Sequence, residues 1–202
     1  MAELKDSEFA ELREIMHKRT GVYLKDTKRP LVITRLRKRL EELDLSTYGQ
    51  YIEQLKRPGS KELEIFINAI TTNETYFFRH SKQFNFLYEE LLPQIREKKN
   101  SATLWSAACS TGEEPYSIAM ICNEFSKKTP GFTTRIYATD VNSEVVKYSR
   151  EGLYGERSLR ESPETMRKRY FRPVESDGRI KKTLYKVEES LKRKVNFGTH
   201  NL

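Results

Sequence analysis

The sequence predicts an α/β protein in which an all-helical N-terminal domain is followed by a domain built on a parallel sheet. Apolar residues recur at helical spacing from the N-terminus to about residue 98. From residue 101 the pattern changes to short apolar runs that are typical of buried strands. The order of elements there is that of the start of a parallel α/β sheet: a strand, a small-residue turn, a helix, a second strand, an acidic residue and another helix.

Four helices are predicted in the N-terminal domain, residues 1–72. Ser7 is the expected N-cap of the first helix, and Ser46 is the expected start of the third. Pro30 suits the first turn of the second helix, and Gly21 suits the end of the first. The apolar faces of the four helices would carry Phe9, Leu12, Ile15 and Met16; Val32, Ile33, Leu36, Leu40 and Leu43; Tyr51, Ile52 and Leu55; and Leu63, Phe66, Ile67 and Ile70.

The rest of the chain divides into a linker with a helix, residues 73–100, and a second domain, residues 101–202. The change of period near residue 101 sets this boundary. The expected elements are a helix at 83–98, strands at 103–107 and 135–139, helices at 115–125 and 142–150, and a small antiparallel β element near 180–198.

Composition excludes several classes of protein. With 37% apolar and 33% charged residues in a chain of 202, we expect a globular protein with a charged surface. No apolar run approaches the ~18–20 residues that cross a bilayer, and the acidic N-terminus does not resemble a secretory signal. We therefore expect a cytoplasmic protein that is not inserted in a membrane, with Cys109 and Cys122 reduced. The three scattered histidines lack the spacing of metal ligands, so no metal site is expected.

The chain is basic, with a formal net charge of +8 and a pI near 9.4. This charge favours a polyanionic partner, which could be nucleic acid, an anionic membrane surface or an acidic protein. On the predicted second helix, Arg35, Lys38 and Arg39 fall together at helical spacing. Glu41 and Glu42 partly neutralise this stripe, so composition alone favours a solvated face and leaves a docking surface as the alternative.

The turn after the first predicted strand carries the small-residue segment ACSTGEEPYS. Small residues at a strand-to-helix turn let the backbone approach a ligand closely. A diphosphate cradle usually has several glycines, whereas Gly112 is alone here and the lysine of a P-loop is missing. The adjacent Glu113 and Glu114 would repel phosphate but would suit a cationic cofactor. An ordinary αβ turn is the alternative.

Asp140 stands at the end of the second predicted strand, where a carboxylate can accept hydrogen bonds from both ribose hydroxyls of a bound nucleoside. The competing role for this side chain is the N-cap of the following helix. Asn142 and Ser143 offer other caps, which favours the ribose role.

The segment NETYFFR, residues 73–79, is a polar turn that runs into aromatic residues. It could serve only to pack the domain, with Phe77 and Phe78 in the core. Arg79 could equally lie in a partly buried site, where a guanidinium orients a carboxylate through two hydrogen bonds.

Four sequence motifs carry a family resemblance: TTNETYFFR, LWSAACSTGEEPYSIAM, IYATDVNSEVV and EGLYGERSLR. In this order and at these separations they closely resemble the chemotaxis-receptor glutamate O-methyltransferases of the CheR type. The resemblance covers essentially the whole chain. It implies that the second domain is a Rossmann-like methyltransferase domain dependent on S-adenosyl-L-methionine (AdoMet), with S-adenosyl-L-homocysteine as the product and no metal.

The resemblance also implies a set of site residues. Arg79 is the residue expected to orient the substrate or the developing ester, and it belongs to the cofactor set as well. Which of Glu113 and Glu114 faces the cofactor is left open. The implied AdoMet contacts are Asn73, Thr75, Arg79, Glu113, Asp140, Asn201 and Leu202.

For partners, the resemblance implies the glutamate-rich methylation helices of chemotaxis receptors, not nucleic acid, and a monomeric enzyme. It reverses the preference for a solvated face and makes Arg35, Lys38 and Arg39 the expected receptor-docking stripe. Two alternatives stay open: an AdoMet methyltransferase acting on RNA or another acceptor, and a basic binding module without catalysis.

In the family that this chain resembles, the sequence continues past the position of Leu202 with a strand that carries a CRNxxIYF-like motif. That motif would supply further cofactor contacts and an active-site tyrosine. We therefore expect the chain to be truncated before this segment and to be a poor catalyst.

Overall fold

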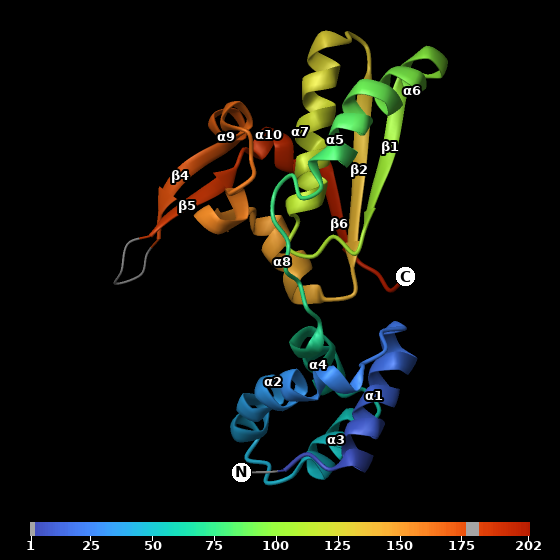
Figure 1. Cartoon of the computed structure of the whole chain (residues 1–202), viewed down its shortest axis with the longest axis vertical. Helices are drawn as coiled ribbons and strands as arrows, with labels where there is room; N and C mark the ends of the chain where they lie inside the picture. Colours follow the sequence, from blue (N-terminus) through green and yellow to red (C-terminus); the bar gives the residue numbers. More distant parts are fainter. Residues whose placement is uncertain (1–2, 177–181) are drawn as a thin grey trace. The chain divides into compact units, whose positions relative to one another are not determined.

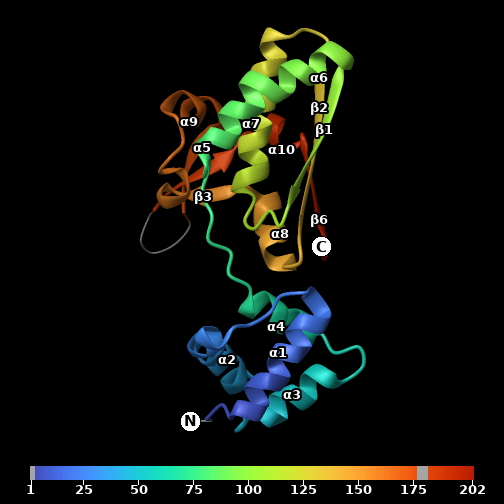
Figure 2. The same ribbon diagram turned by 45° about the vertical axis from the view of Figure 1, so that its right-hand side comes forward.

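The computed structural model describes residues 3–176 and 182–202, and these form two compact units. The first comprises the described residues through Thr72 together with Val141–Ser143 and Asn201–Leu202. The second comprises Asn73–Asp140 and the described residues of Glu144–His200. Figures 1 and 2 show the elements of each unit. In the described parts of the chain no helix combines the length and the apolar character needed to cross a membrane.

The first unit is all-helical, as predicted. Its apolar faces meet in one core that contains Leu12, Met16, Leu36 and Phe66, each without solvent exposure. This burial is the main term that stabilises such short helices. The helices are α1 (Asp6–Thr20), the 3₁₀ turn η1 (Asp26–Lys28), α2 (Arg29–Glu42), α3 (Tyr48–Lys56) and α4 (Glu62–Ile70).

The helix ends follow local capping chemistry. Gly21 ends α1 in the left-handed conformation, with φ of 73°, which glycine adopts at low cost. The prediction that Ser7 is the N-cap of α1 was wrong, because α1 begins at Asp6 and the Glu8 carboxylate accepts a hydrogen bond from the Lys5 amide. Thr47 caps α3 by accepting from the Gln50 amide.

The second unit is built on a parallel sheet with strand order β1-β2-β6. β1 pairs with β2 along its whole length, and β6 pairs with the other side of β2. Helix α7 packs along β2, while α6 contacts β1 and α5 contacts α7 (Figures 1 and 2). The elements are α5 (Ser81–Phe86), the π-helical turn η2 (Leu87–Leu91), α6 (Leu92–Lys98), β1 (Ser101–Ala107), α7 (Glu113–Lys128), β2 (Thr133–Asp140), α8 (Ser143–Glu151) and β6 (Val195–Thr199).

A small antiparallel sheet with strand order β3-β5-β4 completes the second unit. The fold class expected from the sequence, including an antiparallel β element, is therefore confirmed. The partners of the two late strands differ: β5 lies in the antiparallel sheet, whereas β6 lies in the parallel one. Residues 180–181 of the predicted element lie outside the described part. The bounds are β3 (Leu153–Gly155), η3 (Glu156–Leu159), α9 (Glu164–Tyr170), β4 (Phe171–Glu175), β5 (Thr183–Val187) and α10 (Glu189–Lys192).

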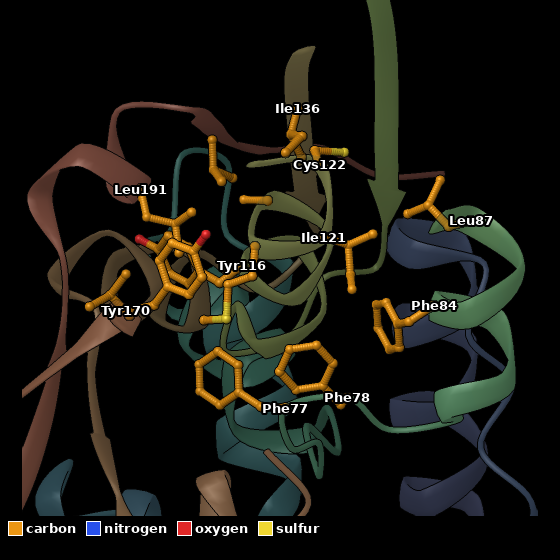
Figure 3. Packing of buried hydrophobic residues seen from close by; sticks show 14 of the residues in the cluster. Phe77, Phe78, Phe84, Leu87, Tyr116, Ile121, Cys122, Ile136, Tyr170 and Leu191 are labelled. Carbon is orange, nitrogen blue, oxygen red and sulfur yellow. The ribbon is translucent and has the colours of Figure 1, made fainter. Parts of the chain in front are cut away.

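An aromatic-rich core holds the second unit together (Figure 3). The ring of Phe77 packs edge to face on Tyr154 and on Phe171, with centroids 4.8 and 4.9 Å apart. Phe78 packs in the same manner on Phe84 at 5.5 Å. Both residues of the Phe77-Phe78 pair are thus core residues, which fixes the segment 73–79 against the sheet domain.

Candidate active site

The loop between β1 and α7 has an unusual backbone. Ala108 and Ser110 have positive φ of 60° and 51°, and Gly112 has φ of 94°. The amide of Cys109 donates to the Thr139 carbonyl at 2.8 Å, which ties the loop to β2. Conformations of this kind cost free energy and persist where the surroundings enforce them, often at functional sites.

Ser110 connects three segments of this unit. Its amide donates to Asp140 Oδ2 at 2.8 Å, and its hydroxyl donates to the carbonyl of Asn73, also at 2.8 Å. Because β1 and β2 are parallel neighbours, their carboxyl ends lie at one edge of the sheet. The Ser110 contacts therefore join this edge to the start of the segment 73–79, at the place where open α/β sheets bind ligands.

Glu113 is a buried carboxylate at the N-terminus of α7, with 2% of its surface exposed. Thr111 Oγ1 donates to one carboxylate oxygen at 2.6 Å and Ser158 Oγ donates to the other at 3.1 Å. Burial raises the pKa of Glu113, and the two hydroxyls and the nearby Arg160 partly oppose that rise. Within the described residues no cation forms an ion pair with it, so the site presents a buried carboxyl group whose ionised form a cationic ligand would stabilise.

Glu114 differs from its neighbour. Its side chain is exposed, and it accepts a hydrogen bond of 2.6 Å from Ser106 Oγ on β1. Of the two adjacent glutamates, Glu113 is therefore the one whose carboxylate is enclosed by the loop and by Ser158.

The backbone of the segment 73–79 is fixed by two hydrogen bonds. The Phe77 amide donates to the Ser158 carbonyl at 2.9 Å, and the Phe78 amide donates to Ser117 Oγ at 3.0 Å. Arg79 is exposed and donates to the Glu74 carbonyl at 3.1 Å. The core packing of Phe77 and Phe78 thus leaves the Arg79 side chain at the surface of the unit.

The described residues contain no group of three or more histidine, cysteine or acidic side chains that could hold a metal ion. Cys109 and Cys122 are both buried, unpaired thiols. Burial raises the pKa of each thiol to about 12, which makes both poor nucleophiles at neutral pH. The chemistry available at this site is that of carboxylates, hydroxyls and guanidinium groups.

Comparison with known proteins finds one family-model match in each part of the chain. Residues 7–71 match the model of the CheR methyltransferase all-alpha domain, and residues 73–202 match the CheR methyltransferase SAM binding domain. The chain belongs to the CheR methyltransferase family. The family resemblance predicted from the sequence is therefore confirmed, and the second unit carries a domain of a type that binds AdoMet.

Relatives named chemotaxis protein methyltransferase match most of the chain. The protein of Borreliella burgdorferi is 35% identical over 202 residues, covering 96% of this chain and 69% of the relative. The proteins of Escherichia coli and Salmonella typhimurium are each 35% identical, covering 98% of this chain and 67% of each relative.

In this CheR-type chain the predicted cofactor residues are partly brought together. Asn73 and Asp140 both contact Ser110, and Glu113 follows three positions later as the first residue of α7. Thr75 is half-buried in the segment that these contacts fix. Asn201 and Leu202 come just after β6 and are exposed, and their role at the adenine end stays a prediction.

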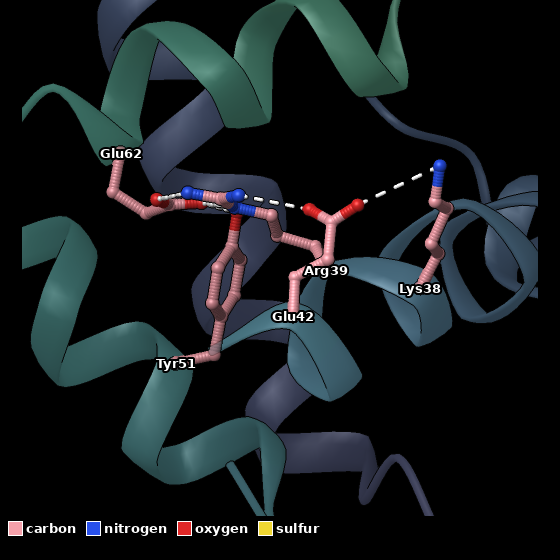
Figure 4. A network of polar contacts seen from close by, with 5 residues as sticks. All are labelled: Lys38, Arg39, Glu42, Tyr51 and Glu62. Atoms are coloured by element: carbon pink, nitrogen blue, oxygen red, sulfur yellow. Dashed lines mark hydrogen bonds and ion pairs between the residues drawn. The ribbon is translucent and has the colours of Figure 1, made fainter. Parts of the chain in front are cut away.

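Members of the predicted docking stripe on α2 have internal partners, and Figure 4 shows those of Lys38 and Arg39. Arg35 donates to the carbonyls of Ala69, Ile70 and Thr71, at 3.0, 3.1 and 2.5 Å. It thereby caps the C-terminus of α4, where cations are favourable.

Arg39 forms two hydrogen bonds to the Glu62 carboxylate, at 2.7 and 2.6 Å, and a further one to Glu42 at 2.9 Å. Lys38, with its side chain 84% exposed, is the member of the stripe that lies at the surface. Helical spacing shows which side chains share a face, but it does not show which of them have a partner on another helix.

Sequence reasoning missed the hydroxyl groups of the site. Ser158, in η3, contacts both Glu113 and the Phe77 amide, and Ser110 joins Asn73 to Asp140. Ser110 could have been suspected from its place in the turn before Gly112. Ser158 carries no such signal, because only the fold brings η3 to the loop.

Proposed function

We propose that the chain is a protein-glutamate O-methyltransferase that acts in the cytoplasm as a monomer and transfers methyl groups from AdoMet to glutamate side chains of chemotaxis receptors. The observation that carries the proposal is the pair of buried carboxylates Glu113, at the N-terminus of α7, and Asp140, at the end of β2. Membership of the CheR family supports the cofactor, and the names of the relatives support the receptor substrate.

The residues at the site suit AdoMet in charge and in donor chemistry. The buried carboxylate of Glu113 would attract the ammonium or sulfonium group, which relieves the cost of holding a desolvated negative charge. Asp140 would accept the ribose hydroxyls while its Oδ2 also accepts from Ser110. Asn73 and Thr75, with Asn201 and Leu202 at the adenine end, would complete the contacts.

AdoMet supplies an electrophilic methyl group on a sulfonium, so the reaction is an in-line displacement that needs no metal. A carboxylate oxygen of the substrate glutamate forms the new bond to the methyl carbon, and the electron pair of the broken bond goes to sulfur. At neutral pH this glutamate is already ionised, so no general base is needed. The task of the protein is therefore positioning, for which Arg79 would hold the substrate carboxylate.

The helical unit would dock the acidic receptor helices through α2. Arg37 and Lys38 are exposed on that helix, whereas Arg35 and Arg39 are held by α4 and Glu62. Of the predicted stripe of Arg35, Lys38 and Arg39, Lys38 would therefore supply the exposed charge, together with Arg37 beside it. Steering of this kind weakens as salt is added.

Labelled methyl transfer tests the proposed reaction. The chain is incubated with methyl-labelled AdoMet and a glutamate-rich receptor fragment, and the product is treated with base. Glutamate methyl esters release the label as volatile methanol, so we expect base-labile label on the fragment and none when its glutamates are replaced by alanine.

Two results would point to the alternatives. Base-stable label, or label on added RNA in place of protein, would indicate an AdoMet methyltransferase with another acceptor. Binding of the receptor fragment without any affinity for AdoMet or its product would indicate a basic binding module.

A further inference from the structure

Beside the candidate site, two arginines lie against one aromatic ring. The guanidinium carbon of Arg160 is 3.6 Å from the ring centroid of Tyr76, and that of Arg79 is 5.9 Å from the same centroid. A guanidinium within about 6 Å of an aromatic face is attracted by the ring. Tyr76 therefore places two cations at the edge of the segment 73–79.

The Arg160 side chain is further fixed by its own loop. It donates to the Arg157 carbonyl at 2.8 Å, and Arg157 in turn forms an ion pair with Glu74 at 3.1 Å. Stacking uses the face of the guanidinium and leaves its in-plane donors for a planar acceptor. In residues 3–176 and 182–202, Arg160 has no carboxylate in ion-pair contact, although it is exposed.

The position of Arg160 relates it to the chemistry of the site. Ser158, two residues earlier, donates to Glu113, and Arg160 is close enough to lower the pKa of that carboxyl. A substrate carboxylate that approaches Glu113 and Asp140 meets repulsion from two negative groups. A cation fixed close to Glu113 would offset this repulsion, which is stronger near a protein surface than in bulk water.

We propose that Arg160, held on the face of Tyr76, is a carboxylate-binding residue of this site and that it recognises an acidic side chain of the substrate polypeptide next to the glutamate that is methylated. This inference rests on the proposed function and adds a second cation to Arg79. It explains why an arginine is stacked and oriented here without an acidic partner in the described residues. The same donors could instead bind the carboxylate of the amino-acid end of AdoMet, which is the other source of this chemistry.

Binding measurements on Arg160→Ala and Arg160→Lys test the proposal. The probes are S-adenosylhomocysteine, an alanine-based helical peptide with glutamates along one face, and the same peptide with glutamines. Arg193→Ala is the matched control, because Arg193 is exposed and its side chain forms no hydrogen bond or ion pair within the described residues. Peptide affinity is measured at low salt with the product bound.

We expect Arg160→Ala to weaken binding of the glutamate peptide about fivefold, the upper range for an exposed ion pair. Affinity for the product and for the glutamine peptide should not change, and Arg160→Lys should recover part of the loss. If only the affinity for the product falls, the contact is with the carboxylate of AdoMet, and recognition of the substrate by Arg160 is overturned.

Three further results would overturn the proposal. Unchanged affinity for both the product and the glutamate peptide would do so. An equal loss of affinity for the glutamate peptide in Arg193→Ala would also overturn it, because it would show a general effect of charge. A large fall in thermal stability of Arg160→Ala would show that the side chain is structural. Product binding by the parent chain, measured in the same series, separates failure of this inference from failure of the proposed function.

Discussion

Replacing Gly112 with alanine should destabilise the sheet unit by about 3 kcal/mol or more. A Cβ at this position would lie 2.7 Å from Ser149 Oγ, 2.8 Å from Ser149 Cβ and 2.9 Å from Tyr154 Oη. Neither neighbour can move easily, because Ser149 donates to Val145 and Tyr154 is fully buried. Overpacking costs about 1–3 kcal/mol, and the left-handed backbone adds about 1–2 kcal/mol for a residue with a Cβ.

Urea denaturation of three variants separates these two causes. Gly131 also has a positive φ, of 81°, but nothing lies within 4 Å of the position that an added methyl group would take, so Gly131→Ala reports backbone strain alone. Gly155→Ala, in open space with φ of −85°, should have neither cost. If Gly112→Ala is no more destabilising than Gly131→Ala, the claim that Gly112 packs closely against Ser149 and Tyr154 is wrong.

Replacing Arg39 with alanine should destabilise the helical unit by about 3 kcal/mol, the lower range for breaking a buried ion pair. The Glu62 side chain is 9% exposed and would lose its guanidinium partner (Figure 4). The remaining hydrogen bond from the Tyr51 hydroxyl, at 2.9 Å, does not neutralise the carboxylate. An uncompensated buried charge is the reason for the large effect.

Thermal unfolding of Arg39→Ala is compared with that of Lys38→Ala, which removes the same charge from the exposed position next to it. Lys38→Ala should change the free energy of unfolding by less than about 1 kcal/mol. Adding Glu62→Gln to Arg39→Ala should recover part of the lost stability, since it removes the unpaired charge. Equal stability of Arg39→Ala and Lys38→Ala would show that Arg39 is a surface residue.

Much of the fold could be predicted because it depends on local patterns. The apolar period located the helices, and Gly21 marked the end of α1 through its left-handed backbone. The partners of the strands could not be predicted in the same way. Val195–Thr199 reads as a strand in isolation, yet its pairing with β2 depends on residues about sixty positions earlier.

The candidate site shows the same division. Gly112, Asp140 and the pair Glu113-Glu114 could be selected because the turn and the strand end give each a recognisable chemical role. Only the burial of Glu113 in the folded unit distinguishes it from Glu114. The partners of Arg35 and Arg39 could not, because the carbonyls of α4 and the Glu62 carboxylate reach α2 only in the folded unit. Residue type and spacing therefore identified the chemical groups, and tertiary packing decided which of them face a ligand.

Calorimetric titration with S-adenosylhomocysteine tests the AdoMet site most directly. The parent chain should bind the product at one site, and Asp140→Ala should weaken binding by more than tenfold, since two charge-assisted hydrogen bonds of about 1.5–3 kcal/mol each are lost. Asp140→Asn keeps an acceptor for the Ser110 amide and serves as the control for loop structure. Product binding that is absent in the parent chain, or that is equally strong in Asp140→Ala, would contradict a cofactor site at the ends of β1 and β2.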